Sequence, residues 1–351
     1  MPETIPIDVD HMKAFLIGLL NTPSPTGFTE SALAYTADAL ASLPLNLRRT
    51  HKGGLVAAWP GQATDAPRAL TAHVDTLGAM VKEIKDNGRL RLSKIGGFHW
   101  NTVEGEGCAI HTSGGSVVRG TLLVTKASSH VHGAETGLVK REDENMEVRL
   151  DERTTSSRET RALGIQVGDF VDFDPRVEAG PAGFIRSRHL DDKASIAALV
   201  GALRAMAGAG LQPAQTTTIL FSNYEEVGHG AAAGIPADAV ELLAVDMAAI
   251  GEGQESDEFN VTICAKDSGG PYDLGLRRRL VHLAETAGIP YKLDTYPYYG
   301  SDGEAFWRAG GDVRVGLIGP GVDASHNYER THIEAVVHTA QLLVEYLRQA
   351  A

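Results

Sequence analysis

The chain has 351 residues, more than one hydrophobic core usually holds, so we expect two domains or one large domain with an insertion. Its formal net charge of -13 argues against nucleic acid as a partner, because a phosphate polyanion would be repelled. The densest basic cluster is Arg277, Arg278 and Arg279, and we expect it on the solvated face of a helix.

Two features of the chain concern its compartment. Cys108 and Cys264 are the only cysteines, too few for a disulfide framework or a thiolate metal site, which suits a reducing environment. The first twenty residues lack the basic region and long apolar run of a secretory signal, and no segment is apolar enough to span a membrane. We therefore expect a cytoplasmic protein without a membrane partner.

The first 78 residues predict two helices and then two strands. Apolar residues at helical spacing predict a helix over 10–20, and Thr29 can cap a second helix that ends near residue 43. Apolar runs predict strands over 55–59 and 68–72. The second strand leads into the motif AHVDTLG, which contains His73 and Asp75.

His73 and Asp75 have the i, i+2 spacing that places two side chains on one face of an extended segment. A histidine metal ligand commonly donates its second ring N–H to a carboxylate, so Asp75 is expected to be the partner of His73. The pattern His-x-Asp alone also fits a structural histidine, which is the commoner case.

Residues 79–186 differ from the rest of the chain in their pattern of predicted strands, turns and helices. Short strand-like runs over 80–84, 90–92, 116–124 and 170–173 are separated by turns that contain glycine, with no long helical pattern between them. A charged run over 135–161 is expected to be a solvated or partly disordered excursion, or to form oligomer contacts. We interpret 79–186 as an all-β insertion in an α/β domain formed by 1–78 and 187–351.

Alternation of helices and strands resumes at residue 187. Asp191 and Asp192 precede a periodic helix, where acids can cap the helix or serve a site. The run 216–221 predicts a buried strand that ends before Glu225 and Glu226, with a loop rich in Gly and Ala that feeds a helix. One of these two carboxylates could bind a cation while the other faces a water, although solvated surface acids would look the same.

The remaining elements complete an open α/β sheet. Strands are predicted over 244–246, 260–265, 291–295 and 313–318, and helices over 274–287 and 333–347. Ligands bind at the carboxyl ends of the strands in such sheets.

Two imidazoles and three carboxylates lie at or just after the predicted strand ends. These residues are His73, Asp191, Glu226, Asp246 and His326. A single sheet would bring all five to one edge. Nitrogen and oxygen donors of this kind suit Zn²⁺, Co²⁺ or Mn²⁺, and a bridging Asp would give enough ligands for two ions.

Five motifs, AHVDTLG, HLDDKAS, NYEEVGHGAA, AVDMA and SHNYER, resemble those of the TET-type dinuclear metallo-aminopeptidases, a family that includes glutamyl and deblocking aminopeptidases. The resemblance covers nearly the whole chain. It implies an α/β/α sandwich catalytic domain with an inserted, smaller β-barrel-like domain used in oligomerisation and substrate access. It also implies a homo-oligomer, such as a dodecamer, that acts on peptides.

The resemblance assigns the metal ligands residue by residue. Asp191 would bridge two divalent ions, with Zn²⁺ expected and Co²⁺ or Mn²⁺ also suitable. His73 and Asp246 would complete the site of one ion. Glu226 and His326 would complete the site of the other.

The resemblance also implies catalytic roles for Glu225 and Asp75. Two neighbouring ions polarise a scissile carbonyl and activate a water, and Glu225 would take the proton of that water and return it to the leaving amine. Asp75 would stand behind His73. The cis peptide that the family often has after its bridging Asp would fall between Asp191 and Asp192.

Two departures from the family pattern concern substrate specificity. Thr76 stands where the family commonly has Glu, and Glu329 follows the proposed ligand His326 at an unusual spacing. Three segments resemble the sequences of a bacterial subgroup linked to gene clusters for the osmoprotectant N-acetylglutaminylglutamine amide. They are HLDDKAS, KDSGGPYD and HNYERTHIEA. A deacylase or amidohydrolase that acts on such a small N-acylated dipeptide amide is therefore an alternative to an aminopeptidase.

Three more distant classes of protein fit the sequence less well. Gly228, Gly230 and Gly234 do not have the G-x-G-x-x-G spacing of a dinucleotide site. A glycosidase needs two carboxylates that flank a bond, which adjacent acids such as Glu225 and Glu226 do not easily do. A non-enzymatic metal-binding protein would not need a carboxylate such as Glu225 that is free to act as a base beside the ligands.

Candidate pocket elements are found near the C-terminal third of the chain. They are Ser301, Asp302 and the KDSGGPYD loop. Ordinary turn residues would have the same pattern.

Overall fold

The computed structural model describes residues 5–350, which form two compact units. The larger unit consists of the residues up to Asp75 and from Arg176 onward, and the smaller unit is Thr76–Pro175. The predicted insertion, 79–186, ends later than this smaller unit. The difference arises because the strand Phe184–Ser187 pairs with Glu329–His332 in the sheet of the larger unit.

The larger unit is built on one mixed sheet. Its central strands β12, β3, β13 and β17 are mutually parallel, and β1 and β2 extend it in antiparallel fashion at one edge. The strands are β1 (Asn46–Arg49), β2 (Leu55–Trp59), β3 (Ala63–His73), β10 (Glu178–Ala179), β11 (Phe184–Ser187), β12 (Gln215–Ser222), β13 (Glu241–Val245), β14 (Ala248–Ile250), β15 (Val261–Lys266), β16 (Tyr291–Thr295), β17 (Arg314–Asp323) and β18 (Glu329–His332).

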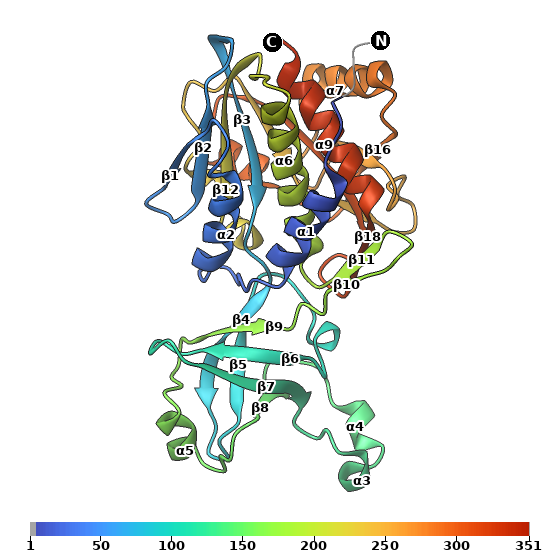
Figure 1. The fold of residues 1–351 in the computed structure, drawn as a ribbon. Coiled ribbons are helices and arrows are strands. Elements are labelled where there is room, and N and C mark those ends of the chain that lie inside the picture. Colours follow the sequence, from blue (N-terminus) through green and yellow to red (C-terminus); the bar gives the residue numbers. More distant parts are fainter. Residues whose placement is uncertain (1–4, 351) are drawn as a thin grey trace. The chain divides into compact units, whose positions relative to one another are not determined.

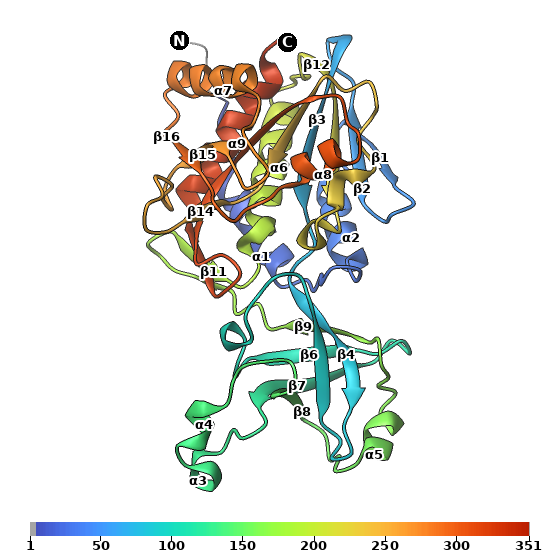
Figure 2. The same ribbon diagram turned by 180° about the vertical axis from the view of Figure 1, so that it is seen from behind.

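Helices cover both faces of this sheet. Figure 1 shows α1, α6, α7 and α9 over one face, and Figure 2 shows α8 over the opposite face. The helices are α1 (Val9–Leu20), α2 (Glu30–Leu40), α6 (Leu190–Gly208), α7 (Leu274–Ala287), α8 (Asp302–Arg308) and α9 (Ile333–Arg348). This arrangement is the predicted α/β/α sandwich.

Strand β13 shows how the sequence supports two cores. Leu243 and Val245 face the core that contains α6 and α9, whereas Leu242 and Ala244 face the core that contains Phe306 of α8. Successive side chains of a strand point to opposite faces, so a strand with helices on both sides must be apolar at every position. The run that follows Glu241, Leu-Leu-Ala-Val, meets this requirement.

The smaller unit is a closed barrel with strands in the order β4-β5-β8-β7-β6-β9. Its core is made of alternating side chains such as Leu90, Cys108, Leu122, Val148 and Val171, all fully buried. The strands are β4 (Gly78–Ile84), β5 (Leu90–Ile95), β6 (Gly107–His111), β7 (Val117–Val124), β8 (Met146–Leu150) and β9 (Phe170–Phe173), and short helices are α3 (Ser129–His132), α4 (Glu135–Leu138) and α5 (Ser157–Ala162).

Three local predictions were wrong. The charged run 135–161 was expected to be a solvated or partly disordered loop, but it contains strand β8. The alternating side chains of Met146, Val148 and Leu150 in this strand lie in the barrel core. The loop after Glu226 feeds no long helix and forms only the short 3₁₀ turns η2 (Glu225–Val227) and η3 (Gly230–Ala232). Thr29 occupies the N-cap position of α2 but makes no capping hydrogen bond with its side chain. Of the helices within 5–350, none has the length and apolar character to cross a membrane.

Candidate metal centre

The candidate site lies at the carboxyl ends of the parallel strands of the larger unit. Strand β3 ends at His73, which is in register with Ser222, the last residue of β12. Asp246 directly follows β13, the neighbour of β3 on its other side. The strand ends therefore bring His73, Asp246 and the segment that carries Glu225 and Glu226 to one edge of the sheet, as predicted.

Asp191 lies between the two histidines. Its Oδ1 is 3.1 Å from Nε2 of His73, and its Oδ2 is 3.4 Å from Nε2 of His326. Asp191 and Asp192 have non-helical backbone angles at the start of α6, and the peptide bond between them is cis, as the resemblance implied. The carboxylate thus presents one oxygen to each imidazole.

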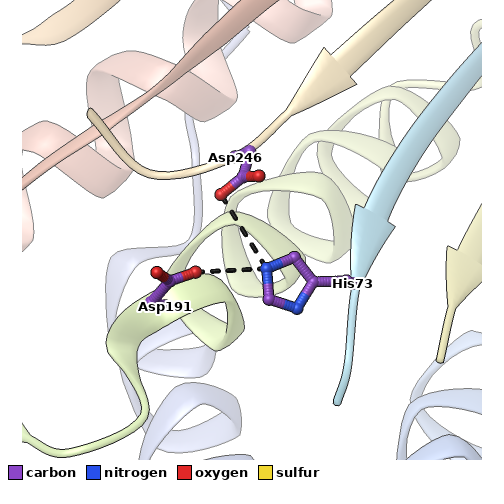
Figure 3. A group of neighbouring side chains, drawn as sticks. All are labelled: His73, Asp191 and Asp246. Atoms are coloured by element: carbon purple, nitrogen blue, oxygen red, sulfur yellow. Dashed lines mark hydrogen bonds and ion pairs between the residues drawn. The ribbon is translucent and has the colours of Figure 1, made fainter. Parts of the chain in front are cut away.

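Two groups of three potential ligands share Asp191. The first group is His73, Asp191 and Asp246, and the second is Asp191, Glu226 and His326; within each group the ligand atoms lie within 4.8 Å of one another. Figure 3 shows the first group, with Asp191 and Asp246 both directed at the same ring nitrogen of His73. These are the groupings that the resemblance implied.

The chemistry of both groups fits a divalent cation. Oε1 of Glu226 and Oδ1 of Asp246 are buried oxygens that accept no hydrogen bond from the described residues. Burial and the nearby Asp191 raise the pKa of Glu226 to about 8 and that of Asp246 to about 7. Ionising a buried carboxylate whose oxygen accepts no hydrogen bond is costly, and a bound cation would remove this cost by favouring the ionised form.

The pKa shifts of His73 and Asp191 favour the charged forms, unlike the shifts of Glu226 and Asp246. Burial alone would lower the pKa of His73, but the bond with Asp191 and the charges of Glu225 and Asp246 raise it well above its ordinary value. Burial likewise opposes ionisation of Asp191, yet His326 and His73 hold its pKa below the ordinary value. The raised pKa of His73 and the lowered pKa of Asp191 therefore both favour the charged forms of this pair.

Asp75 contacts the site differently from the prediction. Nδ1 of His73 bonds to the backbone carbonyl of Asp75 at 2.9 Å, while the nearer carboxylate oxygen is 3.7 Å away. The Asp75 carboxylate instead accepts hydrogen bonds from the backbone N–H groups of Glu225 (3.2 Å) and Glu226 (3.3 Å) and from the hydroxyl of Thr26 (2.7 Å). Asp75 thus holds the segment that carries the two acids.

Glu225 belongs to neither ligand group. Its Oε2 is 3.7 Å from Nε2 of His73, so its carboxyl group lies beside the first group. Burial, with Asp246 and Asp302 nearby, raises the pKa of Glu225 well above its ordinary value, although His73 opposes the shift. A raised pKa is typical of a carboxylate that accepts a proton near neutral pH.

Ser301 and Asp302, predicted as candidate pocket elements, form bonds inside the protein. The Asp302 carboxylate accepts hydrogen bonds from the hydroxyls of Ser222 and Thr71 and from the backbone N–H of Ala231. The hydroxyl of Ser301 accepts from Gly303 N and caps α8. Asp302 therefore joins the ends of β3 and β12 to the turn η3.

Sequence reasoning missed a third supporting acid, Asp192. Its Oδ2 accepts a hydrogen bond from the backbone N–H of His73 at 3.3 Å, and its side chain is fully buried. The sequence left helix capping and a place in a site both open for this residue, without indicating which group it contacts. The contact joins segments 119 residues apart, a distance at which local patterns carry no signal.

Residues 53–342 match the family model of M42 glutamyl aminopeptidases. A Bacillus subtilis protein named "Putative aminopeptidase YhfE" is 52% identical over 330 residues, which are 94% of this chain and 95% of that protein. The chain belongs to the M42 glutamyl aminopeptidase family. As an M42 protein it is a peptide hydrolase, which confirms the predicted family and the predicted class of enzyme.

Solved structures agree with the predicted fold. The TET aminopeptidase of the marine sediment archaeon Thaumarchaeota archaeon SCGC AB-539-E09 matches with a TM-score of 0.87 and 19% identity, over 97% of both chains. The TET1 peptidase of Pyrococcus horikoshii matches with a TM-score of 0.84 and 20% identity, over 97% of this chain and 100% of its own, and it can assemble into a tetrahedron or a large octahedral shell.

Proposed function

We propose that this M42 protein is an aminopeptidase that uses two divalent metal ions, Zn²⁺ first among the candidates. His73, Asp191 and Asp246 would hold one ion, and Asp191, Glu226 and His326 would hold the other. The observation that carries the proposal is the pair of three-ligand groups that share Asp191, with buried oxygens on Glu226 and Asp246 that accept no hydrogen bond from the described residues. The donors are nitrogen and oxygen, which suits Zn²⁺, Co²⁺ or Mn²⁺.

Glu225 is the general base of the proposal. Bound ions would polarise the scissile carbonyl and lower the pKa of a water. Glu225 lies beside the ligand groups without belonging to either, so its carboxylate is left to take a proton from water and deliver it to the leaving amine. The two backbone bonds to Asp75 fix where Glu225 and Glu226 leave the strand, which keeps base and ligand in separate positions.

The excess of carboxylates favours a substrate with a free amino terminus. Glu225, Glu226 and Asp246 are acids whose side chains, largely buried, lie in the same cluster. A peptide's α-amino group can be attracted by this field or can bind a metal ion, and either contact would confine cleavage to the first residue. An N-acylated dipeptide amide lacks that group.

The barrel unit is proposed to serve self-association and substrate access. It carries apolar side chains that are strongly exposed, among them Val131 (75%) and Leu138 (80%) on the short helices α3 and α4. Exposed apolar groups of this size often mark protein contacts. With the assembly of the TET1 peptidase as a parallel, we expect a large homo-oligomer such as a dodecamer. A concentration-independent monomer in sedimentation would contradict this part.

One experiment tests the proposed chemistry. Metal-free protein is loaded with Zn²⁺ or Co²⁺ and assayed on peptides with free amino termini and on N-acetylated dipeptide amides. We expect cleavage of the first residue from free peptides only, and about two ions per chain. Asp191→Ala should lose both ions because both groups share this residue. Full metal occupancy in Asp191→Ala would refute the ligand assignment, and preferred cleavage of the N-acetylated amides would support a deacylase instead.

A further inference from the structure

Glu329 is a buried acid next to the second ligand group whose role neither the family match nor the proposed mechanism assigns. It is the first residue of β18, three residues after His326, and is 0% exposed. Its Oε2 accepts a hydrogen bond from the backbone N–H of Asp191 at 3.0 Å, and its Oε1 accepts one from the backbone N–H of His326 at 3.0 Å. One carboxylate therefore joins the main chains of two proposed ligands.

The two joined segments are distant in the chain, and one of them is strained. Asp191 and Glu329 are 138 residues apart. His326 has a φ of 62°, in the left-handed region that a residue with a side chain adopts at an energetic cost. Such a conformation persists only where its surroundings hold it, and the bond from its N–H to Glu329 is a contact that does so.

The geometry leads us to infer that Glu329 is a positioning residue that sets the distance between Asp191 and His326, and through it the affinity for the second metal ion. This inference rests on the proposed function. A carboxylate suits the task because it has two acceptor oxygens and, when ionised, no donor, so it can serve two N–H groups at once. Glu329 belongs to neither ligand group within 5–350, and it acts through the ligands that it holds.

The two proposed ions differ in their dependence on Glu329. In the second group, Asp191 and His326 both depend on it, whereas Glu226 is held by Asp75. In the first group only Asp191 depends on it, because the backbone N–H of Asp246 bonds to Ile318 within the sheet. Loss of Glu329 should therefore weaken the second ion much more than the first.

The test is a titration of the metal-free full-length protein with Co²⁺, followed by calorimetry and by visible absorption. In Glu329→Gln one carboxylate oxygen becomes an amide NH₂, which cannot accept from a backbone N–H. We expect one Co²⁺ to bind nearly as in the parent and the other to bind about 10- to 100-fold more weakly, the usual loss when a group that orients a ligand is removed. In Asp246→Asn the ion left in place is the second one, so adding Glu329→Gln there should weaken that ion by a similar factor.

Glu258→Gln is the matched control. Glu258 is also a largely buried acid beside β18, but its carboxylate binds the side chain of Arg330 at 2.6 and 2.9 Å and contacts no proposed ligand. We expect both Co²⁺ affinities of this variant to stay within about 3-fold of the parent, the scale of a surface ion pair. A loss of Co²⁺ affinity in Glu258→Gln equal to that in Glu329→Gln would show that any disturbance of β18 acts on the metal site, which overturns a specific role for Glu329.

Glu329→Asp keeps the inference testable if Glu329→Gln does not fold. The shorter side chain keeps its charge but cannot reach both N–H groups, so the second ion should again be selectively weakened. Unchanged Co²⁺ affinities in a folded Glu329 variant, with only a lower melting temperature, would overturn the inference and leave the proposed function intact. A parent protein that binds no Co²⁺ would instead refute the proposed function.

Discussion

Strand β13 has a buried acid at each end, and the protein neutralises only one of them. Glu241, its first residue, lies 3.4 Å from Nε of Arg68 and 3.0 Å from Nη2 of Arg314, and it also pairs with Arg279. Burial would raise the pKa of Glu241, but these arginines hold it below its ordinary value. Asp246, just after the last residue, is raised by burial and by Asp191, and its pKa reaches about 7 although His73 opposes the shift.

This difference separates a structural acid from one that we propose to be functional. A buried carboxylate that is paired with protein cations has its charge balanced within the chain. Asp246 after β13 and Glu226 after β12 instead have raised pKa values although His73 opposes both shifts, which leaves negative charge for a ligand to balance when they ionise. Perturbed acids grouped in this way commonly mark functional sites.

The largest expected effect comes from Glu225, which follows β12 and lies in the same cluster as Asp246. Glu225→Gln removes the proposed base while leaving both ligand groups, so turnover should fall by about 10²- to 10⁴-fold with metal content unchanged. Glu226→Gln should lose metal as well as activity, because Glu226 is in the second group. Rate assays with elemental analysis of the same samples check both. Peptide hydrolysis by Glu225→Gln at the parent rate would rule out this base.

At the amino end of β13, Glu241→Gln should affect folding only. The substitution leaves the buried Arg68 without its acid, and breaking a buried ion pair in this way costs about 3–5 kcal/mol of unfolding free energy. Urea unfolding of the metal-free protein measures this loss. Metal content of the folded variant should equal that of the parent. A lower metal content would contradict the prediction that Glu241 affects folding only.

Bound Zn²⁺ should stabilise the folded protein through the acids of the proposed metal site. Free Zn²⁺ at 100 times its dissociation constant should add about 2.7 kcal/mol per site to the unfolding free energy of the parent, provided that the unfolded chain does not bind it. Asp191→Ala should gain far less, because both groups contain this residue. Thermal unfolding with and without Zn²⁺ provides the measurement, and an equal gain in both proteins would place the bound metal elsewhere.

Glu304 is a buried acid that a protein cation balances only in part, so it stands between Glu241 and Asp246. Its substitution has the smallest expected effect on stability. Burial and Asp267 raise its pKa from 4.5 to about 7, and Arg308 offsets this only in part. The folded protein therefore keeps a proton that the unfolded chain has released, so stability from this group falls as pH rises from about 4.5 to 7. Glu304→Gln should match the parent near pH 4.5 and exceed it by about 1 kcal/mol above pH 7, less than the whole shift is worth because the ion pair with the largely exposed Arg308 is screened by solvent. A constant difference across urea titrations at several pH values would contradict this assignment.

Strand ends were the features that the sequence predicted best. His73, Asp246 and the pair Glu225 and Glu226 each follow an apolar run that could only be a buried strand, and parallel strands bring their carboxyl ends to one edge. The register between β3 and β12 then places Ser222 beside His73. Local pattern and sheet geometry together were enough to assemble the candidate ligands.

Contacts between a side chain and a distant main chain could not be predicted in the same way. Asp75 was expected behind the His73 ring, yet its carboxylate binds N–H groups about 150 residues away. Glu329 could be noticed only as an acid at an unusual spacing. Strand β8 was missed because its outward charged residues hid the alternating apolar ones, which are recognisable only once a neighbouring strand is known.

The first and last strands of the barrel unit, β4 and β9, are paired to each other, with Ala79 opposite Val171. His73 and Asp191 are 118 residues apart, so bringing them together closes a long loop. Once β4 and β9 pair, the flexible part of that loop shrinks to the short connections on either side of the barrel. Loop-closure entropy grows with the logarithm of length, so this shortening lowers the cost of joining the two ligands by about 1–2 kcal/mol. A barrel that forms first would thus favour assembly of the larger sheet, and its hairpin loops could change in length without separating the proposed metal ligands.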